Sequence, residues 1–244
     1  MIVEIVGPSG AGKSTLAAML RDPGADPPTL LSTDLVLDRP GRRWIRHPTA
    51  RNLVGDLAAL PWLLSAWDRY EGFLRFAARR LRAHAPSALA RHNYLRNIVR
   101  RVGLHELARR RDIGATIVAD EGTLHTAYYL FVYSTERAHR SELVRFAELA
   151  PLPDRVVHVR ASIPDLVERS LRRPDPRREL RGASRPEVER WLRRATEVFD
   201  ELLGLDPLRE RVLVVDSADG GLDPAAVRAR LMGARAPAAA RARG

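Results

Sequence analysis

A phosphate-binding pattern lies at the start of the chain, where residues 7–14 read GPSGAGKS and match G-x-x-x-x-G-K-[ST], the Walker A spacing. The glycines let backbone N–H groups point inward at phosphate oxygens, and the helix expected from Lys13 adds partial positive charge at its N-terminus. We expect Lys13 to reach the β- and γ-phosphates of ATP and the Ser14 hydroxyl to coordinate Mg²⁺. The residues expected to bind the nucleotide are Gly7, Pro8, Ser9, Gly10, Ala11, Gly12, Lys13, Ser14 and Thr15.

Lys13 is also the only lysine in a sequence that contains 41 lysine and arginine residues together. An ammonium group is a compact charge on a flexible stem and can follow a phosphoryl group during transfer, whereas a guanidinium is a planar fork. A chain that otherwise uses arginine would keep lysine only where the chemistry requires it. The single lysine therefore strengthens the interpretation of the motif.

Carboxylates follow two of the expected strands. Asp120 and Glu121 end the apolar run at 115–122, where Asp120 could join Ser14 in holding Mg²⁺. Asp34 ends the run at 27–34 and could accept the proton of an acceptor hydroxyl, as could Glu121. Each of these carboxylates could instead cap the turn or helix that follows. If the acceptor is a phosphate, no base is needed.

The elements that must position these residues can be read from the hydrophobic pattern. Apolar runs predict strands at 2–6, 27–34, 115–122, 154–161 and 210–218. Apolar strands that alternate with helices are typical of a parallel sheet covered on both faces. We therefore expect an α/β fold of three layers with a parallel sheet of about five strands. The expected helices span Lys13 to about Leu20, then 49–111 in several pieces, 123–148, 163–172, 186–204 and 223–232.

The domain organisation follows from the same pattern. We expect a single domain over 1–233, with a helical lobe inserted at about 49–111, where Leu53, Leu57, Leu60 and Leu64 recur at helical spacing. The residues at 234–244 have no apolar periodicity, and we expect them to be disordered.

Composition excludes several classes of protein. The chain has no cysteine, which rules out disulfides and thiolate metal sites, and its seven histidines show no zinc-binding spacing. No stretch is apolar enough to span a membrane, and we see no secretory signal, so we expect a cytoplasmic protein. We leave open whether the chain forms a homodimer.

The net charge of +11 bears on partners. It keeps nucleic acid open as a partner, but we do not favour it, because heavy use of arginine across the whole sequence explains the charge equally well. The motif also excludes some phosphate-binding proteins. GTPases read guanine with an Asn-Lys-x-Asp segment that needs a second lysine, and no LSGGQ-like stretch of a transport ATPase is present. What remains is a small enzyme that moves a phosphoryl group.

The chain resembles the P-loop nucleoside and nucleotide kinases, especially the thymidylate-kinase-like group. The residues that carry the resemblance are the strand and loop at 2–14, the DE at 120–121, the arginine-rich segment after the fourth strand, and VVDSA at 214–218. The resemblance implies a lid at about 169–182 that closes over the phosphates, and Arg169 and Arg173 are our candidates within it. It also implies that the loop at about 217–220 holds the adenine.

The resemblance has one departure, because these kinases usually carry an arginine beside the acidic residue where this chain reads DEG. We therefore expect an ATP- and Mg²⁺-dependent kinase that transfers the γ-phosphoryl group to a small acceptor, first of all a nucleoside or nucleotide. The alternatives are a kinase of a sugar, an antibiotic or another hydroxyl metabolite, then a polynucleotide 5′-kinase, and then an ATP-binding regulator without catalysis.

Overall fold

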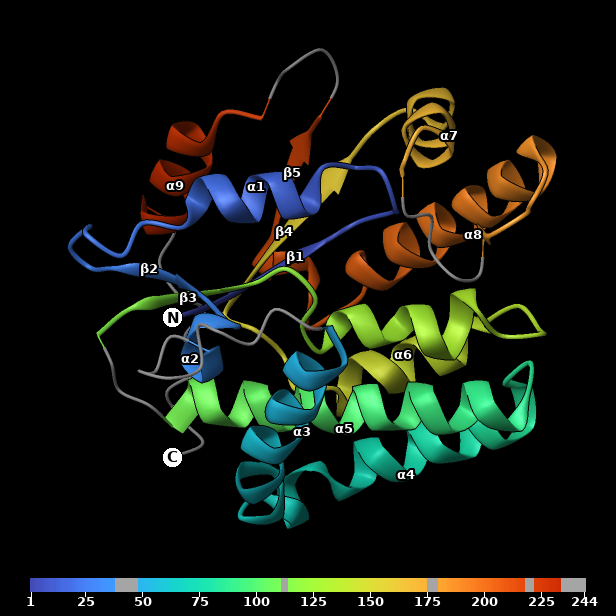
Figure 1. Cartoon of the computed structure of the whole chain (residues 1–244), viewed down its shortest axis with the longest axis horizontal. Coiled ribbons are helices and arrows are strands. Elements are labelled where there is room, and N and C mark those ends of the chain that lie inside the picture. The colour runs from blue at the N-terminus through green and yellow to red at the C-terminus, as the bar shows by residue number, and fades with distance from the viewer. Residues whose placement is uncertain (38–47, 111–113, 175–179, 218–221, 234–244) are drawn as a thin grey trace.

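Five short parallel strands form one sheet in the order β2-β3-β1-β4-β5, so the strand that leads into the phosphate-binding loop lies in the middle (Figure 1). The structure is a computed structural model that describes residues 1–37, 48–110, 114–174, 180–217 and 222–233. The strands are β1 (Ile2–Val6), β2 (Thr29–Leu31), β3 (Thr116–Ala119), β4 (Arg155–Arg160) and β5 (Val212–Asp216). The expected α/β fold with a five-stranded parallel sheet is confirmed.

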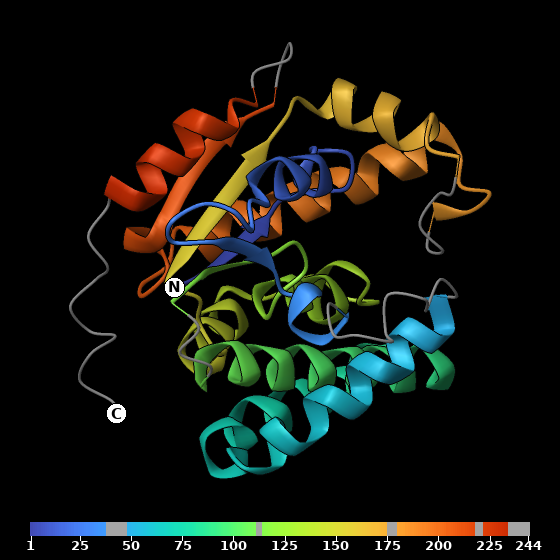
Figure 2. The same cartoon turned by 60° about the vertical axis from the view of Figure 1, so that its left-hand side comes forward.

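Strand β1 shows why the sheet needs helices on both faces. Val3 and Ile5 point into one core and Val6 into another, and all three are fully buried. Such a strand reads as a continuous apolar run because both of its faces are covered. Helices α1 and α8 lie on opposite sides of the sheet (Figure 2).

The helices agree with most of the expected segments. They are α1 (Lys13–Leu20), α2 (Asp34–Leu37), α3 (Pro48–Leu64), α4 (Trp67–His84), α5 (Ala88–Arg110), α6 (Arg140–Leu149), α7 (Ile163–Leu171), α8 (Arg185–Leu203) and α9 (Pro224–Gly233). Helices α3, α4 and α5 form a helical lobe below the sheet in Figure 1. No helix of the described residues is both long and apolar enough to cross a membrane.

The single helix predicted over 123–148 is wrong. The chain instead makes a 3₁₀ turn at Leu124–Thr126, a π-helical turn at Tyr128–Val132, and then α6. Two features explain the break. The buried Arg80 on α4 donates to the carbonyl oxygens of Leu130 and Arg137, which holds the chain between the two segments. His139 and Glu142 then form a capping box that starts a new helix.

Several expectations fall outside the described residues. These are the disorder of 234–244 and the middle of the predicted lid at 175–179. The same holds for part of the predicted adenine loop, 218–220.

Candidate active site

The phosphate-binding loop connects β1 to α1 and can be built only with glycine at its first position. Gly7 has φ +142°, and a Cβ atom there would lie 2.2 Å from the carbonyl oxygen of Val159 on β4. Gly12 has φ +94° and is the N-cap of α1, so the chain turns sharply into the helix. The loop is therefore held close against β4. The Tyr128 hydroxyl donates to the Gly7 carbonyl at 3.0 Å and fixes the loop from the other side.

Lys13 is the first residue of α1, and its side chain folds back over the loop. The Nζ atom donates to the Pro8 carbonyl oxygen at 2.8 Å, and the side chain is buried. An ammonium group over this loop, at the N-terminus of α1, is suited to meeting phosphate oxygens.

Ser14, the second residue of α1, and Asp120, directly after β3, come together. Because β1 pairs with β3 in parallel, the residues after their carboxyl ends meet at one edge of the sheet. The Ser14 hydroxyl donates to Asp120 Oδ2 at 2.7 Å. The other carboxylate oxygen, Asp120 Oδ1, is buried and has no hydrogen-bond partner among the residues that the structure describes.

This pair fits the expected magnesium site. A buried carboxylate oxygen without a partner is costly unless a cation or water satisfies it, and a hydroxyl with a carboxylate is a donor set that Mg²⁺ accepts. The described residues contain no cluster of three or more histidine or acidic side chains that could hold a metal. The pair is therefore suited to an ion that takes its remaining ligands from phosphates and water.

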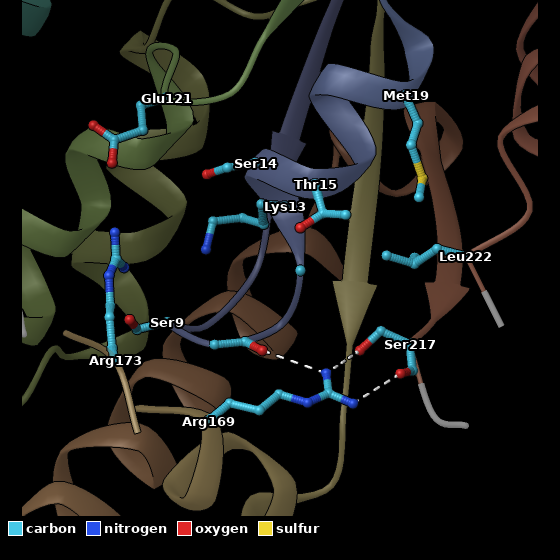
Figure 3. A pocket seen from close by; sticks show the side chains of 12 residues that line it. Ser9, Lys13, Ser14, Thr15, Met19, Glu121, Arg169, Arg173, Ser217 and Leu222 are labelled. Atoms are coloured by element: carbon cyan, nitrogen blue, oxygen red, sulfur yellow. Dashed lines mark hydrogen bonds between the residues drawn. The ribbon is translucent and has the colours of Figure 1, made fainter. Parts of the chain in front are cut away.

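A cavity of about 570 Å³ opens beside the loop (Figure 3). In Figure 3 Glu121 and Arg173 lie on one side of Lys13, and Met19 and Leu222 lie on the other. The cavity thus has a charged end next to the lysine and an apolar end beyond Thr15. This division suits a ligand with a phosphate chain and an apolar ring.

Arg169 and Arg173, the two candidates from the predicted lid, both line the cavity. Arg169, near the end of α7, donates to the Ser217 side chain at 3.0 Å and to the Ser217 carbonyl at 3.1 Å, and it approaches the Gly10 carbonyl at 3.4 Å. Arg169 therefore ties the phosphate-binding loop to the end of β5 in this structure (Figure 3). Ser217, which the resemblance placed near the adenine, also lines the cavity.

Glu121 lines the cavity and is held from behind by an arginine that our sequence analysis did not identify. Arg101 on α5 is buried, and its Nη2 atom lies 2.6 Å from Glu121 Oε2 and 3.1 Å from the Tyr129 hydroxyl. Its Nη1 atom donates to the Glu121 carbonyl oxygen. Burial alone would lower the pKa of Arg101, but Tyr129 and Glu121 hold it above its ordinary value.

Arg101 also bears on the missing arginine of the DEG segment. A guanidinium does accompany Glu121, but it comes from the helical lobe rather than from the neighbouring position in the sequence. No spacing in the sequence links residues 101 and 121, so only the fold could reveal the pair.

Glu4 is a second residue that the sequence analysis did not single out. It lies in the middle of β1 with its side chain buried, and its carboxylate accepts from the backbone N–H groups of Leu124 at 3.0 Å and His125 at 2.8 Å. Burial raises the pKa of Glu4 to about 7. A Cβ atom at Gly122 would lie 2.4 Å from Glu4 Oε2, so the segment after Glu121 passes directly over this carboxylate. Its signal in the sequence is the one charged residue in IVEIV.

Asp34 lies apart from this group. It is the first residue of α2, where its Oδ2 atom accepts from the Leu31 backbone N–H at 2.9 Å and from Arg21 Nε at 2.8 Å. It is not among the described residues that line the cavity. These contacts are those of a residue that fixes the turn between β2 and α2.

The family model of the AAA domain matches residues 2–202. A solved structure of deoxyadenosine kinase from M. mycoides with the products dCMP and a flexible dCDP bound matches at a TM-score of 0.54 and 16% identity, covering 96% of this chain and all of that one.

A crystal structure of the protein TT1252 from Thermus thermophilus matches at a TM-score of 0.36 and 18% identity, covering 96% of this chain and 98% of that one. No curated protein sequence matches the chain. The family match covers most of the chain, including the loop at 7–14 and the carboxylates at 120–121. The chain therefore belongs to the AAA-domain family, and its fold is similar to that of the solved deoxyadenosine kinase.

Proposed function

We propose that the protein is an ATP-dependent phosphotransferase that moves the γ-phosphoryl group to a small acceptor. The observation that carries the proposal is the hydrogen bond from Ser14, which lines the cavity together with Lys13, to Asp120, because a hydroxyl with a carboxylate is a donor set that Mg²⁺ accepts. A nucleotide-binding loop alone would serve a regulator equally well. Glu121 and Arg173 line the cavity together with Lys13, and these charged side chains favour a catalytic role over that of a regulator.

The proposed mechanism assigns one task to each residue. Mg²⁺, held by Ser14 and Asp120, would neutralise charge on the phosphates of bound ATP. Lys13 follows the γ-phosphoryl group, and Arg173 adds positive charge on the same side. The acceptor hydroxyl attacks the γ-phosphorus, its proton passes to the Glu121 carboxylate, and ADP leaves with the β–γ bridging oxygen. We assign the proton to Glu121 rather than Asp34 because only Glu121 lines the cavity.

For the acceptor we propose a nucleoside or nucleotide. The support is the likeness of fold to a deoxyadenosine kinase over nearly the whole of both chains. A sugar, an antibiotic or another hydroxyl metabolite would use the same loop, metal pair and carboxylate. The acceptor must therefore be identified by experiment.

The test is the transfer of labelled γ-phosphate from ATP, with Mg²⁺, to separate pools of nucleosides, nucleotides, oligonucleotides, sugars and aminoglycosides. Lys13→Ala is the blank. A labelled product in the nucleoside or nucleotide pool that disappears with Lys13→Ala supports both the reaction and the acceptor class. A labelled product in another pool would support the proposed reaction but contradict the proposed acceptor class. Tight ATP binding with slow hydrolysis in every pool would contradict the proposal and favour a regulator.

A further inference from the structure

Arg101 is buried in the helical lobe and yet contacts a side chain that lines the cavity. The residue is 7% exposed on α5, whereas the side chain of its partner Glu121 is 42% exposed. A glutamate side chain with that much contact with solvent ordinarily changes rotamer freely. The direction of the Glu121 carboxylate therefore depends on the arginine behind it.

One guanidinium holds Glu121 at two points. Its Nη2 atom donates to Glu121 Oε2 at 2.6 Å, and its Nη1 atom donates to the carbonyl oxygen of the same residue. Two donors of one rigid plane thus join the carboxylate to its own main chain, which restricts rotation of the side chain. Tyr129 fixes the guanidinium in turn, because its hydroxyl accepts from Nη2 at 3.1 Å and its ring centre lies 5.6 Å from the guanidinium carbon.

The main chain that follows Glu121 is fixed by a second buried charged residue. Glu4 on β1 accepts from the backbone N–H groups of Leu124 at 3.0 Å and His125 at 2.8 Å. The segment after β3 is therefore held by β1 through its backbone and by α5 through Arg101. Because the backbone is held in this way, the contacts from Arg101 act on the direction of the Glu121 side chain.

We propose that Arg101 is a positioning residue for phosphoryl transfer, which holds the Glu121 carboxylate where the acceptor hydroxyl delivers its proton. The inference rests on the proposed function, in which Glu121 takes that proton. Proton transfer needs the two oxygens within about 2.6–3.2 Å of each other, and a displacement of about 1 Å can cost about 10² in rate. Arg101 is not among the described residues that line the cavity, so it acts through Glu121 rather than on the substrate.

Arg80 on α4 offers a matched control, because it is another buried arginine of the lobe with the same kinds of contact. It is 6% exposed and pairs with Glu142 at 2.5 Å. It also donates to the Leu130 carbonyl oxygen at 3.3 Å and lies 5.6 Å from the centre of the Phe131 ring. None of these four residues is among the described ones that line the cavity. A substitution of Arg80 therefore reports the loss of a buried arginine alone.

Arg101→Lys tests the proposal, because an ammonium keeps the charge but has one nitrogen in place of the two that hold Glu121. With ATP, Mg²⁺ and the nucleoside pool at saturation, we expect kcat to fall by about 10–10² and the KM for ATP to change less than about threefold. Arg80→Lys should lower the melting temperature and leave kcat within about threefold of the wild type. An Arg101→Lys enzyme with the wild-type kcat, or an equal loss in both variants, would overturn the proposal.

A double variant separates positioning from a general effect on the fold. Since Arg101 acts through Glu121, adding Arg101→Lys to Glu121→Gln should change the rate less than about threefold. Adding Arg80→Lys to Glu121→Gln should do the same as it does in the wild type. If the losses from Arg101→Lys and Glu121→Gln multiply, Arg101 does not act through that carboxylate.

Crystal structures of the wild type and of Arg101→Lys add a measurement that needs no activity. We expect the Glu121 side chain to have one orientation in the wild type and to leave it in the variant. If the wild type phosphorylates no acceptor, the proposed function fails, and these structures still decide on Arg101. A Glu121 carboxylate that keeps its place in Arg101→Lys would overturn the positioning role, and a displaced one would support it.

Discussion

At the scale of single residues, the clearest feature is the one lysine in an arginine-rich chain. Lys13 lies over the phosphate-binding loop with its Nζ atom 2.8 Å from the Pro8 carbonyl oxygen. A guanidinium carries its charge across three nitrogens in a plane and is wider. This difference in shape gives a physical reason for a lysine at this position.

We therefore predict that Lys13→Arg lowers the rate of phosphoryl transfer by about 10²–10³, as expected when one preorganised contact to the transferring group is lost. The fall should approach that of Lys13→Met, which removes the charge entirely. Steady-state rates with saturating ATP measure it, and calorimetry of ATP binding shows whether the nucleotide still binds. An arginine variant that keeps more than a tenth of the wild-type rate would refute the argument from shape.

The two candidate bases can be separated at the same scale. Glu121→Gln should lower transfer to a hydroxyl acceptor by about 10²–10⁴ because the proton acceptor is lost. Asp34→Asn should change the rate less than about tenfold but lower the melting temperature, because Asp34 bonds to Arg21 and to the Leu31 backbone. Rates at saturating acceptor, measured for both variants under one set of conditions, decide between them. A larger loss of rate in Asp34→Asn than in Glu121→Gln would identify Asp34 as the base.

At the scale of elements, the sequence predicted what depends on neighbouring residues and missed what depends on distant ones. The strands are apolar runs and the loop is a local motif, so both could be read directly. Arg101 and Glu121 are 20 residues apart and meet only because α5 packs against β3. The helix predicted over 123–148 failed because Arg80, far away in the sequence, holds the chain in a different path.

Helices α4 and α5 show another long-range arrangement, centred on Glu106. This carboxylate is completely buried and accepts from the Tyr70 hydroxyl at 2.5 Å and from Arg109 Nε at 2.8 Å, with Arg110 on its other oxygen. Burial alone would raise the pKa of Glu106, but the hydrogen bonds from Arg109, Tyr70 and Arg110 lower it to about 2. The carboxylate therefore stays ionised and joins the two helices.

We predict that Glu106→Gln lowers the free energy of unfolding by about 3 kcal/mol, because it removes the buried anion from several guanidinium groups. Urea denaturation measures the loss. Glu148→Gln is the control: Glu148 pairs with Arg145 at the surface, where such pairs contribute about 0–1 kcal/mol. Equal losses in the two variants would mean that the Glu106 cluster is no stronger than a surface pair.

At the scale of the whole molecule, the strand order brings the phosphate-binding loop, Asp120 and the end of β5 to one edge of the sheet. The centre of the sheet carries ionisable groups in the same core that supports the loop. Glu4 lies on β1, and His158 lies on the neighbouring β4 with its side chain buried. Burial lowers the pKa of His158 to about 4 and that of His105 on α5 to about 4 as well.

These groups make opposite contributions to the pH dependence of stability. A buried histidine with a lowered pKa stabilises the fold above about pH 6.5, and that stability is lost as the pH falls toward 4. Glu4 has a raised pKa, so the folded state holds its proton up to about pH 7 while the unfolded chain releases it near 4.5. Its contribution is complete below about pH 4.5 and is lost as the pH rises through 7. The two effects oppose each other in the wild type.

Replacing Glu4 separates them. Glutamine does not ionise, so Glu4→Gln should remove the contribution to the free energy of unfolding that decreases as the pH rises, and leave the contribution of the histidines. The free energy of unfolding of the wild type minus that of Glu4→Gln should therefore decrease by about 3 kcal/mol between pH 4.5 and 7.5, whatever its absolute value. Urea denaturation at five or six pH values measures the difference. A difference that stays constant across this range would show that Glu4 has the same pKa in the folded and unfolded chains. A difference that increases with pH would show that the N–H groups of Leu124 and His125 stabilise the ionised carboxylate.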